Sequence, residues 1–199
     1  MDLQFKTSVQ DILVEDHHAT GIVLENGQTI HAKKVVLAPG RDGSAWLTKV
    51  LSNQGLKLYN NQVDIGVRVE TSNIVMEEIN KNLYEGKFVY NTSVGTKVRT
   101  FCSNPSGHVV IENHSGTMLA NGHAYHDPKL GSKNTNFALL VSHTFSEPFN
   151  EPNEFAHEIS KLANKLSNGS VIVQRYGDIK RGRRTTYKRL KEGYTEPTL

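Results

Sequence analysis

Residues 97–121, KVRTFCSNPSGHVVIENHSGTMLAN, contain three short strand-like segments separated by brief polar turns. The segments cover residues 97–102, 108–112 and 117–121, and the links between them contain Asn, Ser and Gly. Strands joined by links of this length and composition are typical of antiparallel neighbours. This stretch therefore predicts an antiparallel sheet.

Further strands and helices are expected on both sides of this stretch. Runs of apolar and β-branched residues indicate strands at 63–70, 87–90 and 136–142. Apolar side chains at helical spacing indicate helices at 44–54, 73–83 and 152–166. Strands outnumber helices and do not alternate with them regularly. We therefore expect an α+β protein with a mostly antiparallel sheet and about three helices.

The first forty residues carry the signals of a β-meander. Ile12 and Val14 alternate with polar neighbours, and so do Ile22 and Leu24. This alternation indicates half-buried strands. The dipeptide Asn26-Gly27 favours the positive φ of a tight hairpin turn, so the second and third strands are expected to pair.

The run VVLA at residues 35–38 is apolar without alternation. A strand buried on both faces is the expected structure for such a run. The strand should stop at Pro39-Gly40, because proline cannot continue a ladder. A helix is expected to follow, with Ser44 as its N-cap and Gly55 as its stop. Small residues at such a turn allow a backbone to approach a ligand closely.

Composition sets the broad class of the protein. The chain has 199 residues and one cysteine, which excludes an internal disulfide framework. No apolar run approaches the roughly 18 residues of a membrane span, and the first residues do not resemble a signal peptide. We expect a soluble cytoplasmic protein that does not enter a membrane. A shift of composition near residues 55–61 predicts two domains, at 1–56 and 57–199.

Sequence motifs for common chemistries are missing. The chain contains no G-x-G-x-x-G loop, no Walker phosphate loop and no H-E-x-x-H helix. Nine histidines are present, among them His17-His18, but nothing fixes a convergent set of ligands, so no metal site is expected. No His, Tyr or Lys has a context that marks it as a catalytic acid or base.

The segment from Arg175 to Lys191 holds most of the positive charge. Its eight basic residues and one acid give +7, whereas the chain as a whole carries +3. Such a segment could neutralise several phosphates, in which case binding would weaken steeply with salt. A nucleic-acid-binding module is therefore the alternative function, and a solvated surface or an internal pairing segment is the simpler explanation.

Cys102 is placed at the end of a predicted strand, before the turn Asn104-Pro105-Ser106-Gly107. A reactive cysteine needs a nearby cation, and Arg99 is the closest one in sequence. Residues 99 and 102 point to opposite faces of a regular strand, which weakens that pairing. Composition alone therefore favours a buried, inert thiol.

Several stretches, in order, resemble one family. They are VVLAPGRDG at 35–43, VDIGVRVE at 63–70, KVRTFC at 97–102, NGH at 121–123, NTNFALL at 134–140 and the run from Gly177-Asp178 to Arg184. Together they are similar to a family of bacterial FAD-dependent dehydrogenases, whose fold is like that of the glutathione-reductase-type flavoproteins. The similarity covers essentially the whole chain.

The chain also departs from that family. Its members begin with a Rossmann unit that bears the glycine-rich pyrophosphate loop and end with a further segment near the flavin, and both are missing here. The resemblance implies an internal piece, made of the end of an FAD domain and most of a substrate-side domain. Excision from a longer gene and natural truncation both remain open. This piece alone is expected to bind FAD weakly or not at all.

The resemblance assigns few residues. It implies that the backbone of Val9 lies near adenine and that Ala38, Pro39, Gly40 and Arg41 flank the FAD. It places Cys102, Asn104 and Gly107 on the substrate side, possible neighbours of the isoalloxazine ring. The implied function is an FAD-dependent oxidoreductase acting on a small molecule, with the substrate and catalytic residues unassigned. A third possibility is a domain for folding or subunit interaction without a site of its own.

Overall fold

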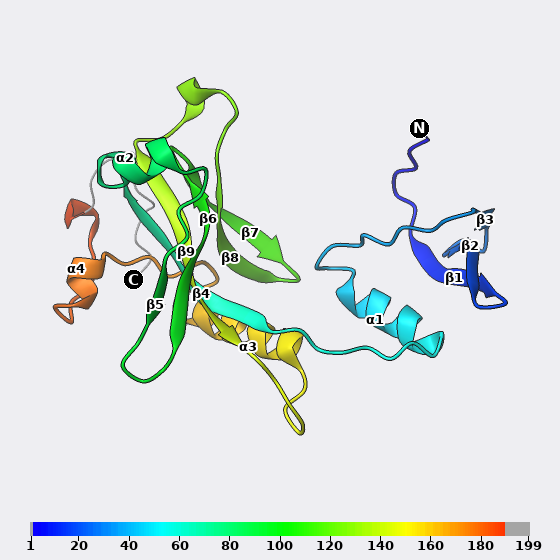
Figure 1. Cartoon of the computed structure of the whole chain (residues 1–199). Coiled ribbons are helices and arrows are strands. Elements are labelled where there is room, and N and C mark those ends of the chain that lie inside the picture. Colours follow the sequence, from blue (N-terminus) through cyan, green and yellow to red (C-terminus); the bar gives the residue numbers. More distant parts are fainter. Residues whose placement is uncertain (1, 190–199) are drawn as a thin grey trace. The chain divides into compact units, whose positions relative to one another are not determined.

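A computed structural model describes residues 2–189 of the chain. The polypeptide divides into two compact units, one up to Tyr59 and the other from Asn60 onward. The first unit has one sheet and one helix, and the other sheets and helices of the described residues belong to the second unit (Figure 1).

The first unit is built on a three-stranded antiparallel meander in the order β1-β2-β3 (Figure 1). Its strands are β1 (Val9–Glu15), β2 (His18–Leu24) and β3 (Thr29–His31). Gly27 has a φ of 83° in the turn between β2 and β3, a conformation that glycine adopts without steric cost. The meander and its hairpin were both predicted from the sequence.

A single helix, α1 (Ser44–Asn53), contacts the meander, where Nε1 of Trp46 donates to the Gln10 carbonyl at 3.0 Å. The core of this unit is small, since Ile12, Leu24 and Val50 are its only buried apolar side chains among the described residues. The N-cap of α1 is Gly43 and not Ser44, which forms the first turn instead. A Cβ on Gly43 would approach the Cβ of Pro39 to 2.4 Å, so the turn before the helix is tightly folded.

The predicted buried strand at residues 35–38 is wrong for this chain. Residues 34–39 form neither helix nor strand, and Val36 is 89% exposed. The sheet ends at β3, and none of the described strands pairs with this run. An apolar segment without a neighbouring strand or a covering layer cannot form a ladder and cannot be buried.

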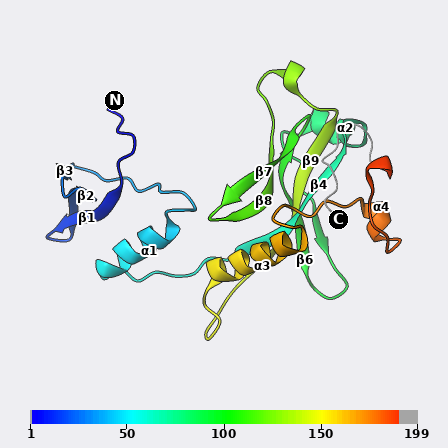
Figure 2. The ribbon, with the colours of Figure 1, turned by 180° about the vertical axis from the view of Figure 1, so that it is seen from behind.

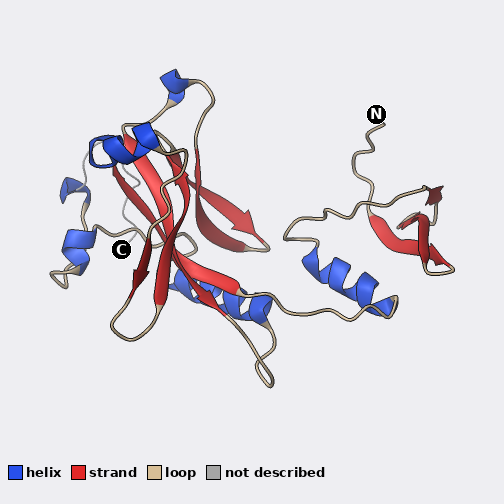
Figure 3. Cartoon of the chain, in the orientation of Figure 1, coloured by secondary structure: helices blue, strands red, loops and turns tan. Residues whose placement is uncertain are grey.

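The second unit is a four-stranded antiparallel sheet in the order β4-β9-β6-β5. A separate hairpin of β7 and β8 contacts β4, β6 and β9 (Figure 3). The strands are β4 (Val63–Ser72), β5 (Val89–Asn91), β6 (Lys97–Asn104), β7 (His108–His114), β8 (Thr117–His123) and β9 (Asn134–His143). This arrangement confirms the α+β class and the mostly antiparallel sheet.

Three helices and two short 3-10 turns accompany this sheet. Ser72 caps the first helix by accepting a hydrogen bond from the Ile74 amide at 3.3 Å. The helices are α2 (Asn73–Asn82), α3 (Pro152–Leu166) and the single turn α4 (Tyr176–Ile179), and the 3-10 turns span Pro128–Leu130 and Tyr187–Arg189. None of the helices within residues 2–189 is both long and apolar enough to cross a bilayer.

Helix α3 lies against β8 and β4 (Figure 2). Its apolar stripe, with Phe155, Ile159 and Leu162, is exposed. Phe155 nevertheless contacts the rings of His143 and Phe145, with centroids 5.7 and 5.2 Å away. Asn164 accepts a hydrogen bond from the Met118 amide at 2.7 Å and donates one to the Met118 carbonyl at 2.9 Å. Aromatic contacts and polar anchoring therefore both hold this helix.

Candidate functional site

A polar cluster lies where β4, β9 and β6 meet in the second unit. It consists of Arg68, Cys102, Asn104 and Asn136, and we call it the Arg68 cluster. Asn136 is opposite Asn104 in the β6–β9 pairing, and the side chain of Arg68 reaches it from β4. Asn136 has no exposed surface, which places a polar amide in the interior of the unit.

The guanidinium of Arg68 is held by neutral oxygen atoms. Its Nε donates to Oδ1 of Asn136 at 2.9 Å, and its Nη2 donates to the same oxygen at 2.7 Å. Nη2 also donates to the carbonyl of Cys102 at 2.9 Å. Because the two oxygens lie on different strands, these bonds fix the plane of the guanidinium.

A bulge in β6 turns Cys102 toward this arginine. The β6–β9 register shifts between Phe101 and Asn104, and Cys102 has a φ of 50°. A non-glycine residue in this conformation costs about 1–3 kcal/mol, so the surrounding contacts must hold it. The Cys102 carbonyl also accepts from Nδ2 of Asn104 at 2.9 Å, and its Sγ lies 3.9 Å from Nη2 of Arg68.

Gly122 of β8 covers the Arg68 cluster. A Cβ on this residue would lie 1.9 Å from Nη2 of Arg68 and 2.0 Å from Oδ1 of Asn136. Real Cβ atoms do not approach other atoms so closely, so a side chain cannot be accommodated at this position without movement. The hairpin therefore rests directly on the hydrogen bonds between Arg68 and Asn136.

Two groups of the Arg68 cluster are incompletely paired: the charge of Arg68 and the Nδ2 atom of Asn136. Within residues 2–189, no carboxylate forms an ion pair with Arg68, which is half-buried. The Nδ2 atom of Asn136 is buried and has no hydrogen-bond acceptor. Most buried polar atoms in proteins have a partner, so these two groups mark the cluster as chemically incomplete.

The predicted substrate-side residues fall in or beside this cluster. Cys102 and Asn104 belong to it, and Gly107 is buried next to it, where its amide donates to the Asn104 carbonyl at 3.2 Å. Arg99 does not contact the thiol, since it forms an ion pair with Asp64 at 2.6 Å. The cation beside Cys102 is therefore Arg68.

Arg68, Asn136 and Gly122 were not predicted as site residues. Each lies within one of the stretches quoted in the sequence analysis, at 63–70, 134–140 and 121–123, but their positions alone gave no role. The signal that identifies them is the strand register, which brings β4 and β9 together.

The residues expected near FAD lie in the first unit. Val9 begins β1 and is opposite Leu24 in the pairing with β2. Ala38, Pro39, Gly40 and Arg41 form the exposed turn before α1, and Gly40 has a φ of 70°. A Cβ on Gly40 would meet no atom within 4 Å, so the backbone of this turn is open to a ligand.

The basic segment folds around a buried acid. Asp178 is 1% exposed, and its carboxylate accepts a hydrogen bond from Nε of Arg183 at 2.6 Å and one from the Thr185 hydroxyl at 3.1 Å. Arg175 and Arg189 each approach it to 3.9 Å. Three of the arginines thus face their own acid and not a partner; Lys191 lies outside the described residues.

These contacts predict a pH dependence. The hydrogen bond from Arg183 holds the pKa of Asp178 below its ordinary value of 3.8. A carboxyl with a lowered pKa stabilises the fold above its unfolded-state pKa, and this contribution is lost as the pH falls through the folded-state value. Asp178→Asn is therefore expected to lower the urea midpoint at pH 7 and to have a smaller effect at about pH 3.

The matched control is Glu77→Gln, which removes an exposed pair with Lys81 on α2. This change is expected to alter the free energy of unfolding by at most about 1 kcal/mol. A difference between native chain and Asp178→Asn that grows as the pH falls would contradict the prediction.

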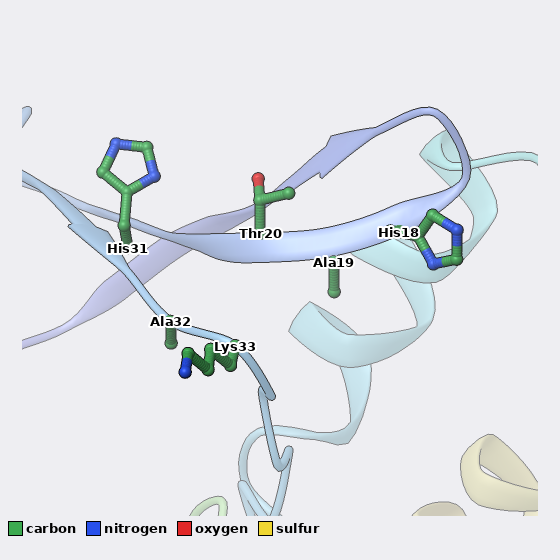
Figure 4. Close-up of a pocket in the computed structure, with 6 residues that line it drawn as sticks. All are labelled: His18, Ala19, Thr20, His31, Ala32 and Lys33. Carbon is green, nitrogen blue, oxygen red and sulfur yellow. The ribbon is translucent and has the colours of Figure 1, made fainter.

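Two further hollows lie on the surface of the described residues. One is lined by residues of β2, β3 and the following chain, namely His18, Ala19, Thr20, His31, Ala32 and Lys33. Their side chains are spread along neighbouring strands and do not converge (Figure 4). The other lies on the β7–β8 hairpin, where Nε2 of His123 is 3.2 Å from Oε1 of Glu112. No group of three metal-binding side chains occurs in the described part of the chain.

No protein-family model matches this chain, and no curated protein matches it either. The candidate site is therefore defined by its geometry.

Proposed function

We propose that this chain is an internal part of an FAD-dependent oxidoreductase. The first unit contributes to the FAD-binding domain, and the second contributes the substrate-side wall that carries the Arg68 cluster. The observation that carries the proposal is the apolar run at residues 35–38, which pairs with none of the described strands and in which Val36 is 89% exposed. In a complete FAD domain this run would be covered by neighbouring strands and helices.

The exposed surface supports the same proposal. Many large apolar side chains of the described residues are exposed, among them Val36, Ile74 and Tyr84. Such a surface is expected of a segment that packs against further parts of a longer protein.

The cofactor and the protein would have different roles in the reaction. When bound, FAD supplies hydride or electron transfer, and the protein supplies binding, orientation and exclusion of water. The open turn at 38–41 suits a backbone contact with the cofactor, as the resemblance implies. On the substrate side, Arg68 offers a fixed positive charge, and Cys102 offers a thiol at the same place.

The amino-acid sequence encoded on either side of this segment tests the proposal. We expect a glycine-rich strand–turn–helix upstream and a further flavin-contacting segment downstream, and we expect the longer protein to be yellow as purified. The chain of 199 residues should show no stoichiometric absorbance in the flavin bands. Stoichiometric flavin in this chain, or an unrelated sequence on both sides, would overturn the proposal.

A pair of exposed residues provides a sharper test. In the chain alone, Val36→Asp should change stability by no more than about 0.5 kcal/mol, because Val36 is already in water. In the longer protein it should cost at least about 2 kcal/mol and release the flavin, because the same side chain would be buried there.

The control is Ile74→Asp on α2 of the second unit, where Ile74 is 82% exposed. It should leave flavin content unchanged in the longer protein. Equal effects of the two substitutions on flavin content would show that the run at 35–38 has no special place in the FAD domain.

A further inference from the structure

We propose that Arg68 binds the carboxylate of a small organic acid, and that Cys102 lies beside the bound acid. This inference concerns only residues of the second unit, and it holds independently of the flavin. The expected ligand is a compound that carries one negative charge on the group that contacts the guanidinium of Arg68.

The charge balance is the first argument. Arg68 is half-buried, and its hydrogen-bond acceptors in the described structure are two neutral oxygens, from Asn136 and Cys102, and the Cys102 sulfur at 3.9 Å. Removing a charge from water without a counter-ion is costly, so an uncompensated arginine at such a position favours an anion. Asp64, an acid on the same strand as Arg68, pairs with Arg99 instead.

The donor count is the second argument. A guanidinium has five N–H donors, and three of them are used by the two neutral oxygens. The two donors on Nη1 have no acceptor among residues 2–189. Because Nε and Nη2 are held from two strands, Nη1 is presented in a fixed direction, and less conformational entropy is lost when a ligand binds.

The number of charges selects a carboxylate. Arg68 is the only cation that contacts the other members of the cluster in the described structure, so a single negative charge completes it. A phosphate carries up to two charges and generally needs several donors or cations. The neighbouring groups are the thiol of Cys102 and the amide of Asn104, whose Nδ2 lies 3.5 Å from Sγ. The remainder of the ligand would therefore lie beside a nucleophilic sulfur.

The single cysteine provides a direct test. Iodoacetate and iodoacetamide both alkylate a thiol: the thiolate sulfur attacks the methylene carbon, the carbon–iodine bond breaks, and iodide leaves with the electron pair. The thiol proton goes to the buffer. Only iodoacetate carries a carboxylate for Arg68. We expect its alkylation rate at Cys102, relative to that of iodoacetamide, to be at least about tenfold higher in the native chain than in Arg68→Met.

The rates are measured at constant ionic strength, so that general electrostatic attraction is the same in each sample. Equal ratios in the native chain and in Arg68→Met would overturn the proposal. If Arg68→Met fails to fold, Asn136→Asp replaces it: this substitution puts a carboxylate against the guanidinium within the chain and should remove the preference for iodoacetate. A preference that persists in Asn136→Asp would also overturn the proposal.

A second measurement does not depend on thiol reactivity or on any variant. The Arg68 Nε–H and the Gly122 amide are followed by NMR as succinate or the neutral succinamide is added to the native chain. Saturable shifts at both positions with succinate alone support the site. Shifts that are absent, or that are the same for acid and amide, contradict it. Flavin content does not enter either experiment, so failure of the flavin proposal would leave these outcomes unchanged.

Discussion

Gly122→Ala is expected to destabilise the second unit by about 3 kcal/mol. The new methyl group would lie within 2 Å of Nη2 of Arg68 and Oδ1 of Asn136. The guanidinium is held from two strands and Asn136 is fully buried, so neither group can move without breaking hydrogen bonds. The expected result is that the β7–β8 hairpin separates from the sheet. Urea denaturation followed by circular dichroism measures the loss.

Gly116→Ala is the matched control in the turn of the same hairpin. Gly116 has a φ of 83°, but a Cβ there would meet no atom within 4 Å. Its substitution should therefore cost only the backbone penalty, about 1 kcal/mol. Trp46, in the first unit, is the only tryptophan, and its fluorescence should be unchanged in both variants. Equal losses of stability for the two glycines would contradict the steric explanation.

The second large effect is expected at the contact between Arg68 and Asn136. Asn136→Leu removes the oxygen that accepts two hydrogen bonds from the guanidinium, which remains half-buried. The expected cost is about 3 kcal/mol, because hydrogen bonds to charged groups are the stronger ones. Arg68→Met alone should cost about 2 kcal/mol, because it leaves Oδ1 of Asn136 buried with little compensation.

The double variant tests whether these two losses share a cause. Arg68→Met with Asn136→Leu removes both partners, so no buried charge is left without its acceptor. The free energies of unfolding should then be less than additive by about 2 kcal/mol. Strict additivity within about 0.5 kcal/mol would show that the two side chains act separately and that the cluster is not a unit.

Much of the fold could be predicted because its signals are local. Alternation at Ile12 and Val14 identified β1, and Asn26-Gly27 identified the hairpin, since both depend only on neighbouring residues. The run at 35–38 was predicted as a buried strand because its composition specifies burial. Whether a strand forms depends on a partner that composition does not supply, and here the described residues offer none.

The candidate site was only partly predictable. Cys102 and Asn104 were singled out, but the orientation of Cys102 was inferred from regular alternation along a strand. The bulge in β6 breaks that alternation and turns the residue toward Arg68, which is distant in sequence. Asn134 and Thr135 extend β9 as buried polar residues, where a polar sequence predicts exposure. Only the register of the sheet shows that these side chains have partners inside the unit.

The large apolar side chains that remain in water have a practical consequence for handling this polypeptide. Attraction between such surfaces on separate molecules is opposed by their net charge, which is +3 at pH 7. That charge falls to zero near the isoelectric point of 8.9. Mildly alkaline buffers therefore remove the electrostatic repulsion and promote aggregation, whereas neutral or slightly acidic buffers preserve the repulsion and keep the protein soluble.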